Sequence, residues 1–214
     1  MEKHEELKTL NMDTVEFNPE FMRMIRPIYH EKFKQMSLKY DPSDGTDFIC
    51  DNMLLTSLEG APQSVRGNFS CDNNNLTSLE GAPQSVGWSF SCDKNHLTTL
   101  KGTPQSVDGT FSCNDNHLTS LEGAPQSVGE SFFCRNNHLT TLSGAPQRIN
   151  GYFYCDNNQL TSLAGAPQSV GWRFFCKNNP KLSEAQINHY KEFLAGEHQE
   201  CLVDGHYMPP ERLK

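Results

Sequence analysis

A unit of 21 residues recurs along most of the chain and constrains its fold more than any other feature. Each unit reads approximately Phe-x-Cys-x-x-Asn-x-Leu-Thr-Ser-Leu-Glu-Gly-Ala-Pro-Gln-Ser-Val. Its cysteine returns at a constant step, at Cys50, Cys71, Cys92, Cys113, Cys134, Cys155 and Cys176. A fixed period of this kind predicts a solenoid, in which each unit packs only against its neighbours. The 214 residues are therefore expected to form one array with end segments.

Polar and apolar residues alternate over residues 68–72 and over the equivalent residues of the other units. This period of two predicts a short strand with one buried face. Stacked in parallel, seven such strands would form a sheet with two inward ladders, one of phenylalanine and one of cysteine. The phenylalanine ladder consists of Phe48, Phe69, Phe90, Phe111, Phe132, Phe153 and Phe174.

An asparagine follows each strand, where its side-chain amide can bond the backbone of a turn. These residues are Asn74, Asn95, Asn116, Asn137, Asn158 and Asn179. Leu76 and Leu79 then return to the core, and Val86 closes the coil. Between them, Gly81 permits a positive φ angle, and Pro83 disfavours helix in the residue before it. We expect the far side of the coil to be rich in loops, with little helix.

Departures from the repeat mark the two ends of the array. Met53 occupies the asparagine position of the first coil, and Pro180 displaces the leucine of the last coil to Leu182. Residues 14–39 predict one or two amphipathic helices, interrupted near Pro27. These helices are expected to cover the first coil.

After the array, Ser183 and the nearby Glu184 predict the start of a helix that runs to about Ala195 and covers the last coil. Residues 202–214 are expected to be a loose tail. The predicted fold class is thus an α+β solenoid with helical ends. Its parts are a helical N-terminal cap over residues 1–46, the solenoid over 47–179, and a C-terminal helical cap with a tail over 180–214.

The composition favours a soluble protein of a reducing compartment. The net charge is −8, and no segment reads as a secretory leader or as a membrane span. Seven of the eight cysteines obey the repeat. In-register strands would hold their Cβ atoms too far apart for easy disulfides, so we expect buried free thiols and a cytoplasmic location. A straight ladder cannot surround a zinc ion, and we expect neither a metal nor another cofactor.

The residues that differ between the copies carry most of the functional information. The outward position between phenylalanine and cysteine reads Ile49, Ser70, Ser91, Ser112, Phe133, Tyr154 and Phe175. Lys and Arg number 3 against 10 Asp and Glu in residues 47–133, but 4 against 1 in residues 134–179. The net charge therefore changes from −7 to +3 along the array.

Outward aromatic and basic residues of the last three coils form the candidate partner-binding set: Phe133, Arg135, Tyr152, Tyr154, Arg173, Phe175 and Lys177. Rigid aromatic residues and arginine dominate protein-binding hot spots. A secondary acidic surface consists of Asp47, Asp51, Asp72 and Asp93. Two alternatives to binding stay open: the aromatics raise strand propensity, or the C-terminal segment folds over them. The set could also hold a nucleotide, whereas the net charge disfavours nucleic acid.

Histidine and tryptophan recur at two further positions, where structural roles are expected. His96, His117 and His138 share one position of successive coils and would form an exposed row, which is a poor geometry for a metal. Trp88 and Trp172 share another position, where packing at the rim of the solenoid is expected.

A catalytic site is not expected, because no nucleophilic triad, phosphate loop or metal motif appears. Cys201 lies outside the cysteine ladder and near His198, Asp204 and His206, so a Cys-His nucleophile is the catalytic alternative there.

Residues 47–179, with Asn-x-Leu-Thr-Ser-Leu after alternating apolar residues, resemble the leucine-rich repeat. The likeness is to the short repeats of bacterial effectors and of small phage-encoded proteins, although 21 residues and Gly-Ala-Pro depart from the effector type. The resemblance implies a curved right-handed superhelix whose concave sheet binds a partner, and no catalytic residue. It favours a modulator, either inhibitor or trigger, of a host protein such as a defence protein. The alternatives are a nucleotide- or small-ligand-sequestering protein and a secreted effector scaffold.

Overall fold

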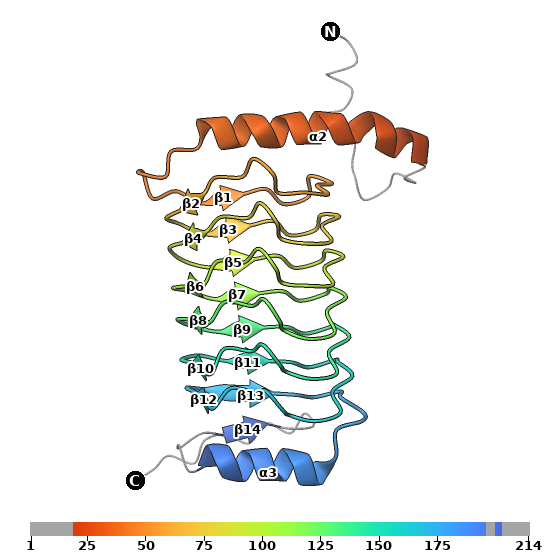
Figure 1. Cartoon of the computed structure of the whole chain (residues 1–214), viewed down its shortest axis with the longest axis vertical. Helices are drawn as coiled ribbons and strands as arrows, with labels where there is room; N and C mark the ends of the chain where they lie inside the picture. The colour runs from red at the N-terminus through yellow and green to blue at the C-terminus, as the bar shows by residue number, and fades with distance from the viewer. Residues whose placement is uncertain (1–18, 196–199, 203–214) are drawn as a thin grey trace.

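A computed structural model describes residues 19–195 and 200–202, with side chains described within residues 23–192. The array is a parallel β-solenoid of stacked coils, which lies between two helices (Figure 1). Sheet A has the order β1 (Phe48–Ile49), β3 (Phe69–Ser70), β5 (Phe90–Ser91), β7 (Phe111–Ser112), β9 (Phe132–Phe133), β11 (Phe153–Tyr154), β13 (Arg173–Phe175) and β14 (Glu200–Leu202). Sheet B consists of β2 (Ser64–Val65), β4 (Ser85–Val86), β6 (Ser106–Val107), β8 (Ser127–Val128), β10 (Arg148–Ile149) and β12 (Ser169–Val170).

In sheet A, each residue pairs with the residue at the same position of the next repeat unit. Phe48 pairs with Phe69, and each later phenylalanine pairs with its equivalent one coil on. Inter-coil hydrogen bonds extend past the formal strand, because Asn52 N donates to Asp72 O at 3.0 Å. The predicted extended segment and its parallel pairing are confirmed.

Phenylalanine and cysteine form the predicted inner ladders. Neighbouring rings of the phenylalanine ladder lie 5.0 to 6.0 Å apart between centroids, and the ladder rings from Phe69 to Phe174 are fully buried. The seven ladder cysteines are free and buried, as predicted. Burial raises the pKa of the Cys92 thiol well above its ordinary value, so the thiolate is disfavoured. The cysteines thus behave as small apolar residues.

The asparagine ladder satisfies backbone groups inside the coil. Asn95 Nδ2 donates to the carbonyls of Cys71, Cys92 and Asp93 at 3.0 to 3.3 Å. Its Oδ1 accepts from Leu76 N at 3.0 Å. The same arrangement recurs in the other coils, which confirms the structural role predicted for these residues.

Two repeated positions of the coils have left-handed backbone. The glycine position has positive φ as predicted, and a Cβ on Gly81 would lie 2.8 Å from Leu58 O. The second position was not predicted, and it consists of Asn52, Asn73, Lys94, Asp115, Asn136, Asn157 and Asn178. Asparagine and aspartate tolerate this conformation better than most residues, which explains their frequency there.

Sheet B was not predicted. Each of its strands has two residues, of which only the Val or Ile is buried. So short a segment gives no alternating pattern, although stacking brings equivalent residues of successive coils into register, as for Val65 and Val86. The far side is therefore a sheet of very short strands between turns.

Helix α2 (Pro19–Lys39) lies against the first coil (Figure 1). It runs through Pro27, so the expected interruption is wrong. Pro27 is exposed, and water can bond the carbonyl that loses its helical partner. The buried Phe33 ring packs edge-on to Phe48 at 6.0 Å, and Tyr40 packs on Phe48 at 5.3 Å. The part of the predicted helix before residue 19 lies outside the described residues.

Helix α3 (Glu184–Ala195) lies against the last coil, within the expected bounds. Its start is a capping box with Gln186 rather than Glu184, because Ser183 N donates to Gln186 Oε1 at 2.9 Å. Tyr190 packs edge-on to Phe174 at 4.8 Å and donates to Pro167 O. Strand β14, unpredicted, adds an eighth strand to sheet A. Residues 203–214, expected to be a tail, lie outside the described residues.

Neither α2 nor α3, the helices of the described part of the chain, combines the length and apolarity that a membrane crossing needs.

Candidate functional site

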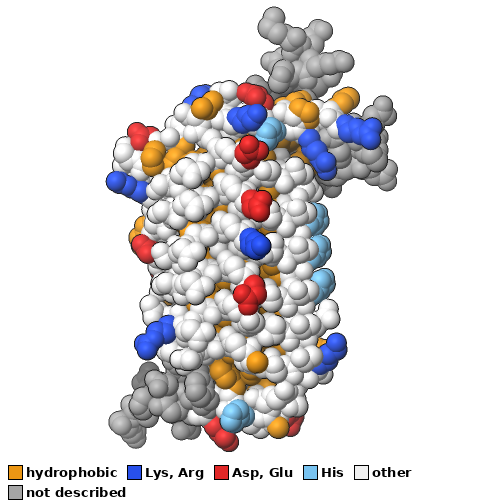
Figure 2. Space-filling view, in the orientation of Figure 1, with side chains coloured by type: hydrophobic (Ala, Val, Ile, Leu, Met, Phe, Trp, Pro, Cys, Tyr) orange, Lys and Arg blue, Asp and Glu red, His pale blue; other side chains and the backbone are white. Residues whose placement is uncertain are grey.

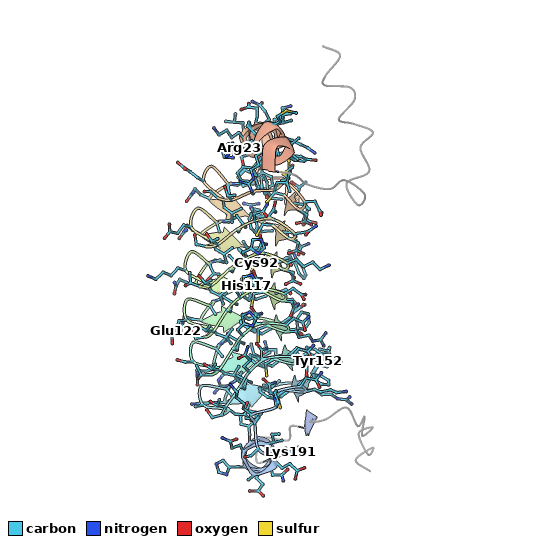
Figure 3. The ribbon with its side chains drawn as sticks, turned by 90° about the vertical axis from the view of Figure 1, so that its right-hand side faces the viewer. Arg23, Cys92, His117, Glu122, Tyr152 and Lys191 are labelled. Carbon is cyan, nitrogen blue, oxygen red and sulfur yellow. The ribbon has the colours of Figure 1, made fainter. Side chains whose placement is uncertain are left out.

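The outer face of sheet A brings all the predicted partner-binding residues together over β9, β11 and β13. We call them, with Trp172, the aromatic surface: Phe133, Arg135, Tyr152, Tyr154, Trp172, Arg173, Phe175 and Lys177. Figure 3 shows Tyr152 projecting on the side of the solenoid opposite Glu122. The prediction that these residues share one face is therefore met by the geometry, while their role stays a prediction.

The rings of the aromatic surface contact one another across three coils. Tyr154 stacks on Phe175 with centroids 4.3 Å apart and planes 4° apart. Phe133 meets Tyr154 edge-on at 5.2 Å, and Tyr152 lies 5.6 Å from Tyr154. Side chains in register on parallel strands stand directly beside one another, so aromatic residues at one position form a continuous cluster. The cluster is preorganised by its own contacts.

Trp172 was assigned only to rim packing and was missed as a member of this surface. Its ring meets Tyr152 edge-on at 4.9 Å and is 61% exposed. The sequence held a signal for Trp172, because it immediately precedes Arg173, which was already in the candidate set. Trp88, its equivalent in an earlier coil, is 59% exposed.

Arg135 is fixed between an aromatic ring and a carboxylate. Its Cζ lies 3.7 Å from the Tyr154 ring centroid, and its Nε lies 3.2 Å from Asp156 Oδ2 without hydrogen-bond geometry. The contact is thus a cation–π interaction combined with an ion pair. Burial raises the pKa of Asp156 above its ordinary value, against the opposing effect of Lys177 N and Arg135.

The acidic surface, Asp47, Asp51, Asp72 and Asp93, lies on the same face over the first three coils. The carboxylates of Asp51, Asp72 and Asp93 form a network with the outward serines, which the sequence did not reveal. Ser70 Oγ donates to Asp51 Oδ1 at 2.6 Å, and Asp72 N donates to the same oxygen at 2.8 Å. The motif recurs for Ser91 with Asp72 and for Ser112 with Asp93. Because these side chains are short and hydrogen-bonded, the outer face of sheet A over the acidic surface is polar and has no large projecting side chain at the serine positions.

Burial raises the pKa of Asp72, and the neighbouring carboxylates of Asp93 and Asp51 add to the effect. Above this half, a pocket of about 320 Å³ opens between the end of α2 and the first coil. Asp41, Asp44 and Asp47 line it beside Tyr40 and Ile49. The first coil therefore joins acidic side chains to exposed apolar surface.

Histidines form the predicted exposed row along another edge of the solenoid (Figure 2). The rings of His96 and His117 are 5.5 Å apart, and those of His117 and His138 are 5.6 Å apart. Among the described side chains, no three His, Cys, Asp or Glu residues converge on a point where a metal could bind. The side chain of Cys201, with His198, Asp204 and His206, lies outside those described.

Comparison with models of known protein families gives no match, and comparison with curated protein sequences gives none either.

Proposed function

We propose that the chain is a non-catalytic module that binds a protein through the aromatic surface. The observation that carries the proposal is the continuous cluster of Tyr152, Tyr154 and Phe175, with Arg135 held against it, on the open face of a regular sheet. Preorganised aromatic residues and arginine contribute most of the binding energy in protein interfaces. The acidic surface on the same face would steer a basic region of the partner.

Ring orientation favours a protein over the alternative ligand, a nucleotide. A base stacks on an open ring face. Here Tyr154 lies between Phe175, stacked at 4.3 Å, and the Arg135 guanidinium, so both of its faces are occupied. The Tyr154 ring therefore leaves its edge, rather than a face, for contacts with protein side chains.

The consensus sequence of the repeat and the parallel coils support a relationship to short leucine-rich-repeat proteins, with their right-handed superhelix. On this basis the chain is a phage- or bacterium-encoded inhibitor or trigger of a host protein, with a defence protein as one candidate; a secreted effector scaffold is the alternative. The packing of Phe33 on Phe48 and of Tyr190 on Phe174 supports capping roles for α2 and α3. Buried free thiols support a reducing cytoplasm.

A pull-down from host lysate with mass spectrometry tests the proposal, comparing the wild type with Tyr152→Ala/Tyr154→Ala/Arg173→Ala. A protein captured by the wild type and lost in this folded variant is the expected result. The control is His96→Ala/His117→Ala/His138→Ala, on another edge of the solenoid, which should capture normally. Equal capture by the wild type and the aromatic variant would contradict the proposal. A rise in the unfolding temperature with added nucleotide would favour the alternative.

A further inference from the structure

Seven strands of sheet A belong to the repeat (β1, β3, β5, β7, β9, β11 and β13), and β14 lies beyond them next to β13. Over these seven strands the outer face is self-complementary about the central coil. Each coil presents three outward positions: before the phenylalanine, between phenylalanine and cysteine, and after the cysteine. In the central coil of the seven these are Thr110, Ser112 and Asn114, which carry no charge. Coils at equal distances on either side of this centre can be compared position by position.

Opposite charges occupy mirrored positions. Arg173 in the last coil corresponds to Asp47 in the first, and Lys177 corresponds to Asp51. One coil from the centre, Arg135 corresponds to Asp93. The face therefore carries three opposite-charge pairs related by reversal of the solenoid axis.

Side-chain size is mirrored in the same way. Phe175 corresponds to Ile49, which is 44% exposed and is the large apolar residue at these three outward positions of the acidic half. Tyr154 corresponds to Ser70 and Phe133 to Ser91. In a reversed second copy, the large rings of Tyr154 and Phe133 would thus face short serine side chains. The apolar side chains of Phe175 and Ile49 would face each other.

The geometry points to a second copy of this chain as an occupant of the aromatic surface. Two sheets A would pack face to face with antiparallel solenoid axes, around a two-fold axis that runs along the strands through the central coil. This inference rests on the proposed function, because it takes the aromatic surface to be a protein-binding surface. The seven rows span about 29 Å, at about 4.8 Å each, so a modest, salt-sensitive dimer is expected.

Charge selects the antiparallel arrangement. With parallel solenoid axes, each acidic surface would face the other, and each group of Arg and Lys would do the same. The antiparallel arrangement leaves one like-charged pair, Asp72 with Asp156. The Asp156 carboxylate already has an ion pair with Arg135, and burial raises the pKa of both carboxyl groups, so this pair is the least costly one to oppose.

Sedimentation velocity at about 0.05 M salt, where charge contacts are least screened, tests the dimer with charge-reversed variants. Lys177→Glu and Asp51→Lys should each weaken dimerisation by about tenfold, since each places like charges together twice. An equimolar mixture of the two variants should dimerise as the wild type does, because residue 51 of each copy then faces a residue 177 of opposite charge. Lys177→Arg is the control and should dimerise normally. A monomeric wild type, or a mixture no better than the single variants, would overturn the inference.

A cysteine at the two-fold axis gives an independent test. Thr110→Cys should be joined into a covalent dimer by a short bis-maleimide cross-linker, because the two copies of residue 110 would face each other across sheets packed about 10 Å apart. Thr119→Cys, exposed outside sheet A, should not, and the wild type controls for the native thiols. Equal cross-linking of the two variants would overturn the arrangement.

The dimer and the proposed function fail separately. A monomer that still captures a host protein through the aromatic surface overturns the dimer alone. If the chain forms a dimer that Lys177→Glu weakens but captures no host protein, only the proposal of a host-protein partner is overturned.

Discussion

The inner and outer faces of sheet A differ in how much they change from coil to coil. On the inner face, phenylalanine and cysteine recur in all seven coils and asparagine in six of them, and all are buried. On the outer face, the residue between phenylalanine and cysteine changes from Ser70 to Tyr154 without any change of strand register. The strand register is thus kept by the repeated inner residues while the outer ones differ. Variation between the copies of a repeat therefore identifies the candidate surface.

Phe132 and Phe133 test this difference most strongly, because they are neighbours of the same type on opposite faces. Phe132 is fully buried in the ladder, whereas Phe133 is half-buried on the outer face. Phe132→Ala should lower the free energy of unfolding by about 3 to 5 kcal/mol, through lost burial and a cavity. Phe133→Ala should lower it by about 1 kcal/mol, through one ring contact. Urea unfolding measures both, and equal losses would contradict the assignment of the two faces.

Asn116→Ala should have the next largest effect. Asn116 Nδ2 donates to Cys92 O, Cys113 O and Asn114 O, and its Oδ1 accepts from Leu97 N. Alanine leaves these buried groups without a partner, at a cost of about 2 to 4 kcal/mol. The control is the neighbouring exposed His117→Ala, which should change stability by less than about 0.5 kcal/mol. Equal midpoints of urea unfolding for the two variants would show that the asparagine ladder is dispensable.

The smallest expected effect concerns Asp72 and depends on pH. Burial raises its pKa above the ordinary value of 3.8, so the folded chain binds this proton more tightly than the unfolded chain. The resulting stabilisation is complete below pH 3.8 and is lost as the pH rises through the raised folded pKa. The amide in Asp72→Asn would keep the accepting oxygen, as the Asn114 amide does for Arg135 N. Asp72→Asn should therefore gain stability relative to the wild type as the pH rises.

Urea unfolding of Asp72→Asn at several pH values checks this expectation. Asp108→Asn, at an exposed residue, controls for the change of net charge. A constant difference between Asp72→Asn and the wild type across the acidic range would show that burial of Asp72 does not disfavour its charge.

Sequence periodicity predicted the parts of the fold that repeat. The inner ladders, the buried asparagines and the glycine turns follow from one coil, since stacking copies every local choice. Sheet B was missed because its two-residue strands leave no pattern, and the helix through Pro27 was misjudged because exposure of the proline is a tertiary property. For the site, residue types predicted the aromatic surface, but the contact of Trp172 with Tyr152 and the serine–aspartate network depend on side-chain positions.

The most direct test gives the aromatic surface the serines that the same position has in earlier coils. The variant Phe133→Ser/Tyr154→Ser/Phe175→Ser is immobilised beside the wild type, and capture of protein, whether from host lysate or as a tagged second copy, is measured once both are shown to unfold cooperatively. We predict that the variant stays folded and captures neither. Undiminished capture, or loss of the fold itself, would contradict the claim that the inner face folds the chain and the outer face binds.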